Sequence, residues 1–344
     1  MTSTAYDRRF ILKQAIALGA LATHPILGAQ AAESKPVFLR PEIDRQLPSG
    51  DEIFLDHIAH FVSDRDAASR AMTRAGFAPA PISIQVNPDP NGGPPRLTGT
   101  GNVTAMMTRG YIEILFKTAD TPLGHELDTA MARYAGLHLA AFAVADAASA
   151  HQRLANSGFK VRPLVQMQRP VETANGSGTA AFTVARVEPD AMAEGRIQIL
   201  THRTEDTVWQ PRWLHHPNGA HGLLDLAIVV ADPNEAAQRF AKFTARSANP
   251  RAFGYALQLD RGQIEIMSRD AFKAMLPELS VPDLPFIGAY GVAVASLDVA
   301  ESKLREGGIE LHRKGPIIVA RFPLELGQGA WIFVEQASDL PWRH

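Results

Sequence analysis

One strand, helix and hairpin unit occurs four times along the chain, and this repetition constrains the fold more than any other sequence feature. Each unit opens with an apolar strand, continues with an alanine-rich helical stretch and closes with a second apolar strand. The opening strands end on residues that can cap a helix, namely Asp64, Asp146, Asp232 and Ser296. The repetition predicts an α+β fold of four equivalent modules.

Strand register allows the four units to be aligned, because successive side chains in a strand point to opposite faces. In the opening strands, the equivalent positions are His57, Leu139, Asp225 and Ala289. In the closing strands, they are Glu113, Gln198, Glu265 and Phe333. We expect these side chains to face the concave side of the sheet, opposite the helices.

Helical spacing predicts helices over Asp66 to Arg74, 121–135 and 147–156. The segment Asn87 to Gly99 is rich in proline and glycine, which predicts an irregular loop at the rim of the concave surface.

Three stretches of the sequence carry a family resemblance through their order and spacing. They are the Leu-Asp-His opening at Leu55, Gly-Thr-Gly-Asn from Gly99 before Tyr-Ile-Glu-Ile at Tyr111, and His-Pro-Asn-Gly-Ala at His216. Over roughly residues 53 to 337, the chain resembles the vicinal oxygen chelate superfamily and, within it, the glyoxalase-like domains. The resemblance implies βαβββ modules that pair into cups around a divalent metal ion, so four modules would form two cups.

A chain of 344 residues is long for one compact core and suits two domains. We expect one glyoxalase-like domain over residues 53–206, a linker over 207–221 and a second domain with shorter modules over 222–344. The linker contains His215, His216 and His221. We interpret it as a loop whose aromatic groups pack between the domains, with a metal-binding tract as the alternative.

The amino terminus is typical of an export signal. Arg8-Arg9 precedes an apolar run from Ala15 to about Leu27, and Ala29-Gln30-Ala31 offers a cleavage site between small residues. The pattern predicts a twin-arginine signal peptide over residues 1–31, a tether over 32–52, and export to the periplasm or the cell exterior. The alternative is an amphipathic helix or a membrane anchor, but the run is short for a stable span.

Composition favours a small-molecule ligand over a nucleic acid. The formal net charge is −2, and no cluster of lysine and arginine follows the amino-terminal segment. The chain has no cysteine, so disulfides and thiolate ligands are excluded and a metal site would use histidine, carboxylate or amide groups. A homodimer is left open.

The resemblance implies His57, Glu113 and Gln198 as metal ligands, with Leu139 where a further ligand is expected. Imidazole and carboxylate ligands suit Zn, Fe, Mn or Ni, and an amide oxygen adds a weaker ligand. Glu113 is also a candidate for proton transfer, because a carboxylate within an apolar strand is costly to bury without a partner. The structural alternatives are an ion pair between Glu113 and Arg109, and a His57 that is hydrogen-bonded to the backbone.

Asn102 and His138 are candidate substrate contacts. Asn102 follows two glycines and could donate to a substrate carbonyl. His138 precedes Leu139 and should face away from the cup unless a β-bulge turns it inward. His60 lies on the helix side and is expected to be a core histidine. In the second pair of modules only Asp225 and Glu265 carry suitable groups, which is typical of a degenerate site.

Three functions follow from these residues. The first is an exported glyoxalase-like metalloenzyme of isomerase or lyase type that abstracts a proton from a small oxygenated substrate. The second is a metal-free protein of the same fold that binds and sequesters a small molecule, which Leu139, Ala289 and Phe333 favour. The third is an extradiol-type dioxygenase, which needs two histidines and a glutamate, whereas only His57 and Glu113 are in register.

Overall fold

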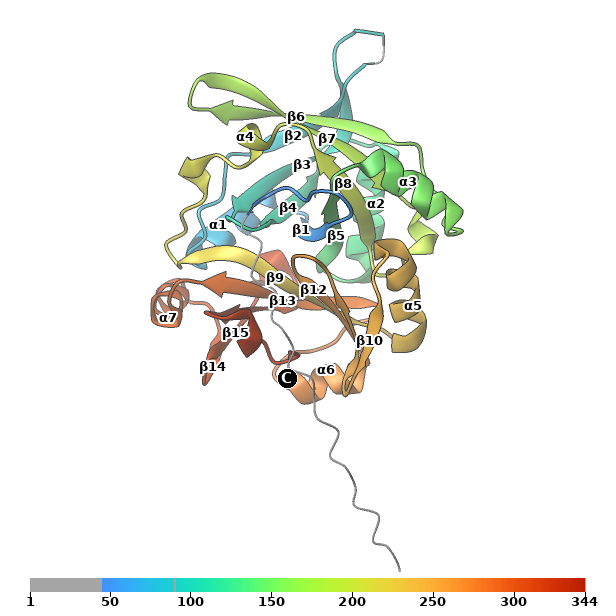
Figure 1. The fold of residues 1–344 in the computed structure, drawn as a ribbon. Helices are drawn as coiled ribbons and strands as arrows, with labels where there is room; N and C mark the ends of the chain where they lie inside the picture. The colour runs from blue at the N-terminus through green and yellow to red at the C-terminus, as the bar shows by residue number, and fades with distance from the viewer. Residues whose placement is uncertain (1–44, 90, 344) are drawn as a thin grey trace, which may run out of the picture. The chain divides into compact units, whose positions relative to one another are not determined.

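The computed structural model describes residues 45–89 and 91–343, which contain four βαβββ modules in chain order (Figure 1). The first module consists of β1 (Ile53–Val62), α1 (Arg65–Arg74), β2 (Ser83–Asn87), β3 (Arg96–Met106) and β4 (Tyr111–Lys117). After α2 (Pro122–Arg133), the second module consists of β5 (Gly136–Val144), α3 (Ala147–Asn156), β6 (Val165–Thr173), β7 (Gly176–Arg186) and β8 (Arg196–His202). The predicted signal peptide, residues 1–31, and most of the predicted tether lie outside the described residues.

The short helices α4 (Glu205–Val208) and η2 (Pro211–Trp213) lead into the second half of the chain. The third module consists of β9 (Ala220–Val229), α5 (Pro233–Thr244), β10 (Ala248–Arg251), β11 (Gly254–Gln258) and β12 (Gln263–Met267). After α6 (Arg269–Met275), the fourth consists of β13 (Phe286–Val294), α7 (Leu297–Glu306), β14 (Leu311–Lys314), β15 (Ile317–Arg321) and β16 (Ala330–Val334). The predicted fold class is confirmed.

The four predicted helix caps are confirmed as well. Asp64, Asp146, Asp232 and Ser296 each accept a hydrogen bond from a backbone N–H in the first turn of α1, α3, α5 and α7, respectively. Each cap lies two or three residues after the end of its opening strand, where it satisfies free N–H groups of the helix that follows.

The predicted loop from Asn87 to Gly99 is shorter than expected, because β3 begins at Arg96. Gly99 and the residues after it therefore lie inside a strand rather than before one. Gly99 has a φ of +94°, and a Cβ at this position would lie 1.9 Å from Oγ1 of Thr121, the N-cap of α2. Glycine is needed here because α2 begins directly against β3.

The first two modules close into an eight-stranded ring in the order β1, β4, β3, β2, β6, β7, β8 and β5, with β5 pairing back to β1. The joint between β2 and β6 consists of one backbone pair, Val86 with Gln168. A barrel of eight strands is just wide enough for side chains to fill. The predicted first cup is therefore a closed barrel with a narrow interior.

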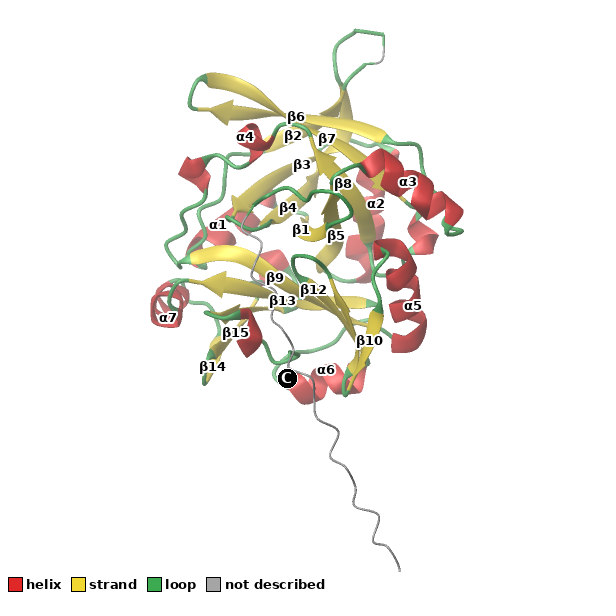
Figure 2. Cartoon of the chain, in the orientation of Figure 1, coloured by secondary structure: helices red, strands yellow, loops and turns green. Residues whose placement is uncertain are grey.

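The last two modules form an open cup, since β10 and β14 stand at its unpaired edges. Its inner face is covered by α6 and the carboxyl-terminal segment, in which Leu340 and Trp342 are fully buried. Ile287 on β13 pairs with Leu137 on β5, so one continuous sheet runs through both halves. In Figure 2, α3 and α5 lie side by side outside the strands, where Arg153 donates to the carbonyls of Lys242 and Phe243.

The predicted register of the fourth module is wrong by one residue. Ala289 pairs with Ala330 and Gly291 with Ile332, so Ile332 faces the inside of the second cup, while Phe333 packs on the helix side against Phe77. The closing strand Ala-Trp-Ile-Phe-Val is buried on both faces, so its sequence contains no alternation that would set the register.

No helix within the described part of the chain is both long and apolar enough to cross a membrane.

Candidate functional site

The structure brings His57 and Glu113 together inside the closed barrel. Parallel pairing of β1 with β4 places Ala59 opposite Glu113, two residues beyond His57. The Nε2 atom of His57 lies 3.7 Å from Oε2 of Glu113, and each residue is 4% exposed. The imidazole of His57 stacks on Tyr111, with ring centroids 4.4 Å apart. Two candidates separated by more than fifty positions in the chain therefore share the inner wall of one barrel.

Asp56 holds the His57 ring in place. The pairing of β1 with β5 shifts register between Leu55 and His57, and this bulge lets two neighbouring side chains interact instead of pointing apart. The Oδ2 atom of Asp56 lies 2.7 Å from Nδ1 of His57, and Oδ1 lies 2.9 Å from Nε2 of His202. Asp56 was not predicted as a site residue, because regular alternation would place it on the opposite face.

Asp56 is ionised at neutral pH. Burial would raise the pKa of its carboxyl group, but the charges and hydrogen bonds of His202 and His57 outweigh burial and hold the pKa well below its ordinary value. A carboxylate at this position accepts the Nδ1–H of His57, so the other ring nitrogen, Nε2, is left facing the barrel interior.

A polar network fixes the Glu113 side chain. Asn102 Nδ2 donates to Oε1 of Glu113 at 2.5 Å, and Gln85 Nε2 lies 3.4 Å from the same oxygen. Thr100 Oγ1 in turn donates to Oε1 of Gln85 at 2.5 Å. Asn102, predicted to contact a substrate carbonyl, thus donates to Glu113 here. Gln85 was not predicted as a site residue, although its position in β2 points inward as alternation would predict.

Three arginines, none of them predicted as site residues, line the same interior. They are Arg169 on β6, Arg186 on β7 and Arg196 on β8. Gln198 also lines the cavity, and its Oε1 accepts a hydrogen bond from Nε of Arg186 at 3.0 Å. Burial, together with the charge of Arg196, lowers the pKa of Arg186 to about 9. The space enclosed by these groups is about 20 Å³, enough for one water molecule.

The donor set does not fit a firmly held divalent ion. His57 and Glu113 are close enough to share one ion, but the oxygen of Gln198 is already engaged by Arg186. No group of three histidine, aspartate or glutamate side chains within residues 45–89 and 91–343 could hold a metal ion. Among the cavity-lining residues, one carboxyl group faces three guanidinium groups, whose charge repels a cation.

His138 lies apart from this cavity. Its neighbours Leu137 and Leu139 pair with His60 and Ala59, so His138 is the bulged residue of β5. Its Nε2 nevertheless donates to the carbonyl of Tyr134 at 2.7 Å, and burial lowers its pKa to about 4. The ring lines a separate pocket of about 450 Å³ beside α2. The bulge that could turn His138 inward is thus present, but the His138 ring does not line the cavity of His57.

Other histidines have structural partners. His60 bonds to the carbonyl of Leu326 at 2.9 Å and to the Tyr290 hydroxyl at 3.2 Å, so it is a core histidine as expected. His216 accepts from the backbone N–H of Ala78 and donates to the carbonyl of Met106, which fastens the linker to the first module.

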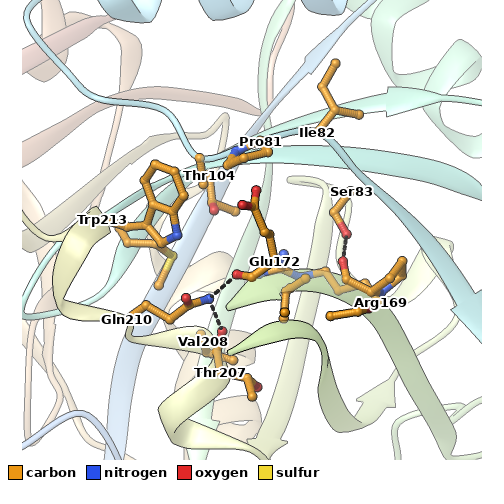
Figure 3. A pocket seen from close by; sticks show the side chains of 16 residues that line it. Pro81, Ile82, Ser83, Thr104, Arg169, Glu172, Thr207, Val208, Gln210 and Trp213 are labelled. Atoms are coloured by element: carbon orange, nitrogen blue, oxygen red, sulfur yellow. Dashed lines mark hydrogen bonds between the residues drawn. The ribbon is translucent and has the colours of Figure 1, made fainter. Parts of the chain in front are cut away.

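A larger pocket of about 500 Å³ opens at one end of the barrel, and Arg169 lines both this pocket and the small cavity (Figure 3). In the view of Figure 3, Trp213 and Arg169 stand on opposite sides of the pocket. Gln210 Nε2 donates to the carbonyls of Glu172 and Thr207 and thereby shapes the lower wall. The interior near His57 therefore adjoins a space large enough for a small organic molecule.

In the second cup, the carboxyl-terminal segment occupies the place that corresponds to the site. Arg343 Nε and Trp342 Nε1 donate to Oδ2 of Asp225 at 2.7 Å and 3.0 Å. Glu265 lies nearby and accepts from Gln263. Burial and the adjacent Asp225 raise the pKa of Glu265 to about 9. The two carboxyl groups expected in a degenerate site are thus covered by protein.

We expect the substitution Glu265→Gln to flatten the pH dependence of stability. The pKa of Glu265 is about 9 in the fold against an ordinary 4.5, so unfolding releases a proton between these values. The free energy of unfolding should therefore fall with rising pH, by up to about 1.4 kcal/mol per unit. Urea unfolding at several pH values measures this slope. Glu306→Gln, on the surface, should keep the wild-type slope, and an unchanged slope in the Glu265 variant would contradict the assignment.

The chain is similar to proteins of known family and structure. The family described as "Glyoxalase-like domain" matches residues 55–244. A hypothetical protein from Staphylococcus aureus has a TM-score of 0.57 at 11% identity, over 82% of this chain and 98% of that chain. A triple mutant of 4-hydroxymandelate synthase from Streptomyces coelicolor has a TM-score of 0.52 at 11% identity, over 85% and 96%.

The Mn(II)-bound glyoxalase from Novosphingobium aromaticivorans has a lower TM-score of 0.46 at 12% identity, over 82% of this chain and 81% of that chain. A comparison with curated protein sequences gives no match. At 11% identity, the two structures with TM-scores of 0.57 and 0.52 show a shared fold alone.

Proposed function

Because this chain belongs to the glyoxalase-like domain family, we propose that its first barrel is the active site of an enzyme that moves a proton on a small oxygenated substrate. The observation that carries the proposal is the 2.7 Å contact between Asp56 and Nδ1 of His57, which leaves Nε2 facing the cavity. A base oriented by a third group is a recurrent arrangement for proton transfer.

In the proposed reaction, His57 removes a proton from a substrate carbon next to a carbonyl group. The C–H bond breaks, its electron pair moves toward the carbonyl oxygen, and the proton forms a bond to Nε2. Asp56 stabilises the resulting imidazolium. The buried guanidinium group of Arg186, which also lines the cavity, would stabilise the developing negative charge on oxygen. Return of the proton to a neighbouring carbon gives an isomerase, whereas departure of a leaving group gives a lyase.

Glu113 is the second proton-transfer group in this proposal. It lies beside His57 on the inner wall of the barrel, and Asn102 and Gln85 orient its carboxyl group. Glu113 would exchange a proton with the substrate oxygen, while His57 removes the proton from the substrate carbon. Both groups move protons without a bound ion.

The test is proton exchange in D₂O, followed by NMR, with a panel of small hydroxy and oxo compounds. We expect the protein to catalyse deuterium incorporation at one carbon of a compound in the panel. Treatment with EDTA followed by dialysis should change the rate less than about twofold, because the proton acceptor is a side chain. Loss of exchange on chelation, with recovery on adding a divalent ion, would contradict this proposal.

A metal-dependent version is the second candidate. It is favoured by the 3.7 Å between His57 Nε2 and Glu113 Oε2, and by Asp56, which stands where a carboxylate often orients a metal-binding histidine. His57, Glu113 and Gln198 would hold Zn, Fe, Mn or Ni in this case, once Gln198 is released by Arg186. Elemental analysis of the purified protein distinguishes the two candidates.

A metal-free binding protein is the remaining alternative, and it would bind panel compounds without exchanging their protons. Export by the twin-arginine route is a separate proposal, supported by the sequence pattern of residues 1–31.

A further inference from the structure

We propose that the first barrel takes an organic carboxylate as its substrate, with the carboxylate bound to Arg169. This inference rests on the proposed function and names the chemical class of its substrate. It is carried by a buried cation beside a pocket of suitable size, for which residues 45–89 and 91–343 supply no hydrogen-bond or ion-pair partner.

Arg169 is a charged side chain inside the barrel for which the described residues supply no counterion. It occupies an inward position of β6 between Met167 and Val171 and is 6% exposed. Within the described chain, no group accepts a hydrogen bond from its guanidinium and no carboxylate forms an ion pair with it. Burial lowers the pKa of Arg169, while Tyr111 and Glu113 oppose that shift from a distance. An arginine nevertheless stays protonated at neutral pH.

An unpaired buried charge destabilises a folded protein. The presence of such a destabilising charge is explained if a bound ligand supplies the opposite charge. The planar guanidinium offers two parallel N–H donors, which match the two oxygens of a carboxylate. One unpaired guanidinium suits a ligand with a single negative charge.

The other interior arginines are already engaged. Arg196 contacts Glu126 Oε2 at 3.3 Å, and Arg186 donates to Gln198. In the pocket beside α2, Arg162 pairs with Glu126 and Glu188. Among the arginines that line the small cavity, Arg169 is therefore the one whose side chain makes no hydrogen bond to another described residue.

Size decides where the rest of the ligand lies. The cavity next to His57 holds about 20 Å³, too little for an organic molecule, whereas the adjoining pocket holds about 500 Å³. Arg169 lines both spaces, so a carboxylate bound there would lie where the small cavity of His57 meets the larger pocket. The remainder of the ligand would extend into the larger pocket, which is lined by apolar groups from Met106, Val171, Val208 and Trp213.

Glu172 also lines this pocket (Figure 3). Its side chain is 66% exposed and lies 3.8 Å from Arg212, so water and a neighbouring cation weaken its field. The positive charge of Arg169 lies deeper and is less screened, so the inner end of the pocket should prefer an anion.

The test compares phenylacetate with phenylacetamide, a neutral probe of the same shape, by titration calorimetry. We expect the wild-type protein to bind phenylacetate more tightly than the amide. Arg169→Gln should weaken phenylacetate binding by at least about 30-fold, because a buried charge pair is lost. Arg169→Lys should retain part of the affinity. Arg70→Gln, on the exposed face of α1, should bind as the wild type does.

The melting temperature separates a binding role from a structural one. Arg169→Gln removes an unpaired buried charge and should melt at or above the wild-type temperature. Equal binding of the two probes, unaltered affinity in Arg169→Gln, or no binding of phenylacetate at millimolar concentration would overturn the inference.

The inference and the proposed function can fail separately. Proton exchange on neutral compounds alone would overturn the carboxylate assignment and leave the proposed function standing. Carboxylate binding that depends on Arg169, without exchange on any panel compound, would overturn the proposed function and leave the anion site.

Discussion

Replacing His57 with glutamine should lower the rate of proton exchange by about 10²- to 10⁴-fold, the usual contribution of a positioned acid or base. Glutamine keeps the length and polarity of the side chain but cannot accept a proton. Asp56 would lose one of its two partners and keep the other, His202. The initial rate of deuterium incorporation, measured at saturating substrate, gives the size of the loss.

The matched control is His312→Gln, which changes an exposed residue of β14 and should exchange at the wild-type rate. The His57 effect should fall on kcat, whereas substitutions of Arg169 should raise KM, because His57 acts in the transition state and Arg169 binds the ground state as well. A His57→Gln protein that is folded and exchanges within a few-fold of wild type would remove His57 from the mechanism.

Replacing Trp342 with alanine should lower the free energy of unfolding by about 3–5 kcal/mol. The indole is fully buried in the second cup, where it packs with residues of β9, β13 and β16. Its Nε1 also donates to Asp225 at 3.0 Å, and loss of this partner adds to the cost of the cavity. Urea unfolding followed by circular dichroism measures the change.

Trp342→Phe should be milder, since it keeps most of the packing and loses one hydrogen bond worth about 1 kcal/mol. Trp213→Ala is the second comparison, because Trp213 is half-buried in a pocket wall and should cost less than Trp342→Ala. Equal losses for Trp342 and Trp213 would show that the carboxyl-terminal segment does not stabilise the second cup.

The modular fold could be predicted because its signals are local. Each helix cap lies two or three residues after the end of its strand, and the first two closing strands, around Glu113 and Gln198, contain polar residues that set the register. The fourth closing strand contains none, and its register was misassigned by one residue. Local alternation thus predicts which side chains of a strand face the interior wherever a polar residue interrupts an apolar run.

The site itself could be predicted only in part. The proximity of His57 and Glu113 follows from strand register, which could be predicted from the sequence. The contact of Asp56 with His57 depends on a bulge in β1, and a bulge arises from pairing with a distant strand. Arg169 and Arg186 belong to hairpins of the second module, and their approach to Glu113 depends on closure of the barrel. A bulge and the closure of a barrel depend on contacts between distant strands, so the local sequence pattern does not predict them.

Closure of the barrel through one backbone pair has a mechanical consequence. β6 is held to β7 by pairs along its whole length, from Val165 to Thr173, whereas Val86 with Gln168 is its one backbone pair with β2. Pro170 has no N–H to offer β2, and a side-chain bond from Ser83 to its carbonyl takes the place of a ladder bond. We expect the wall to part along this seam before any other pair of neighbouring strands in the ring separates, because this joint has the fewest backbone pairs. Ser83 and Arg169 flank this seam, so the frequency of its opening would set how fast molecules enter and leave the barrel. Opening of the wall, rather than the chemical step, would then limit the rate of turnover.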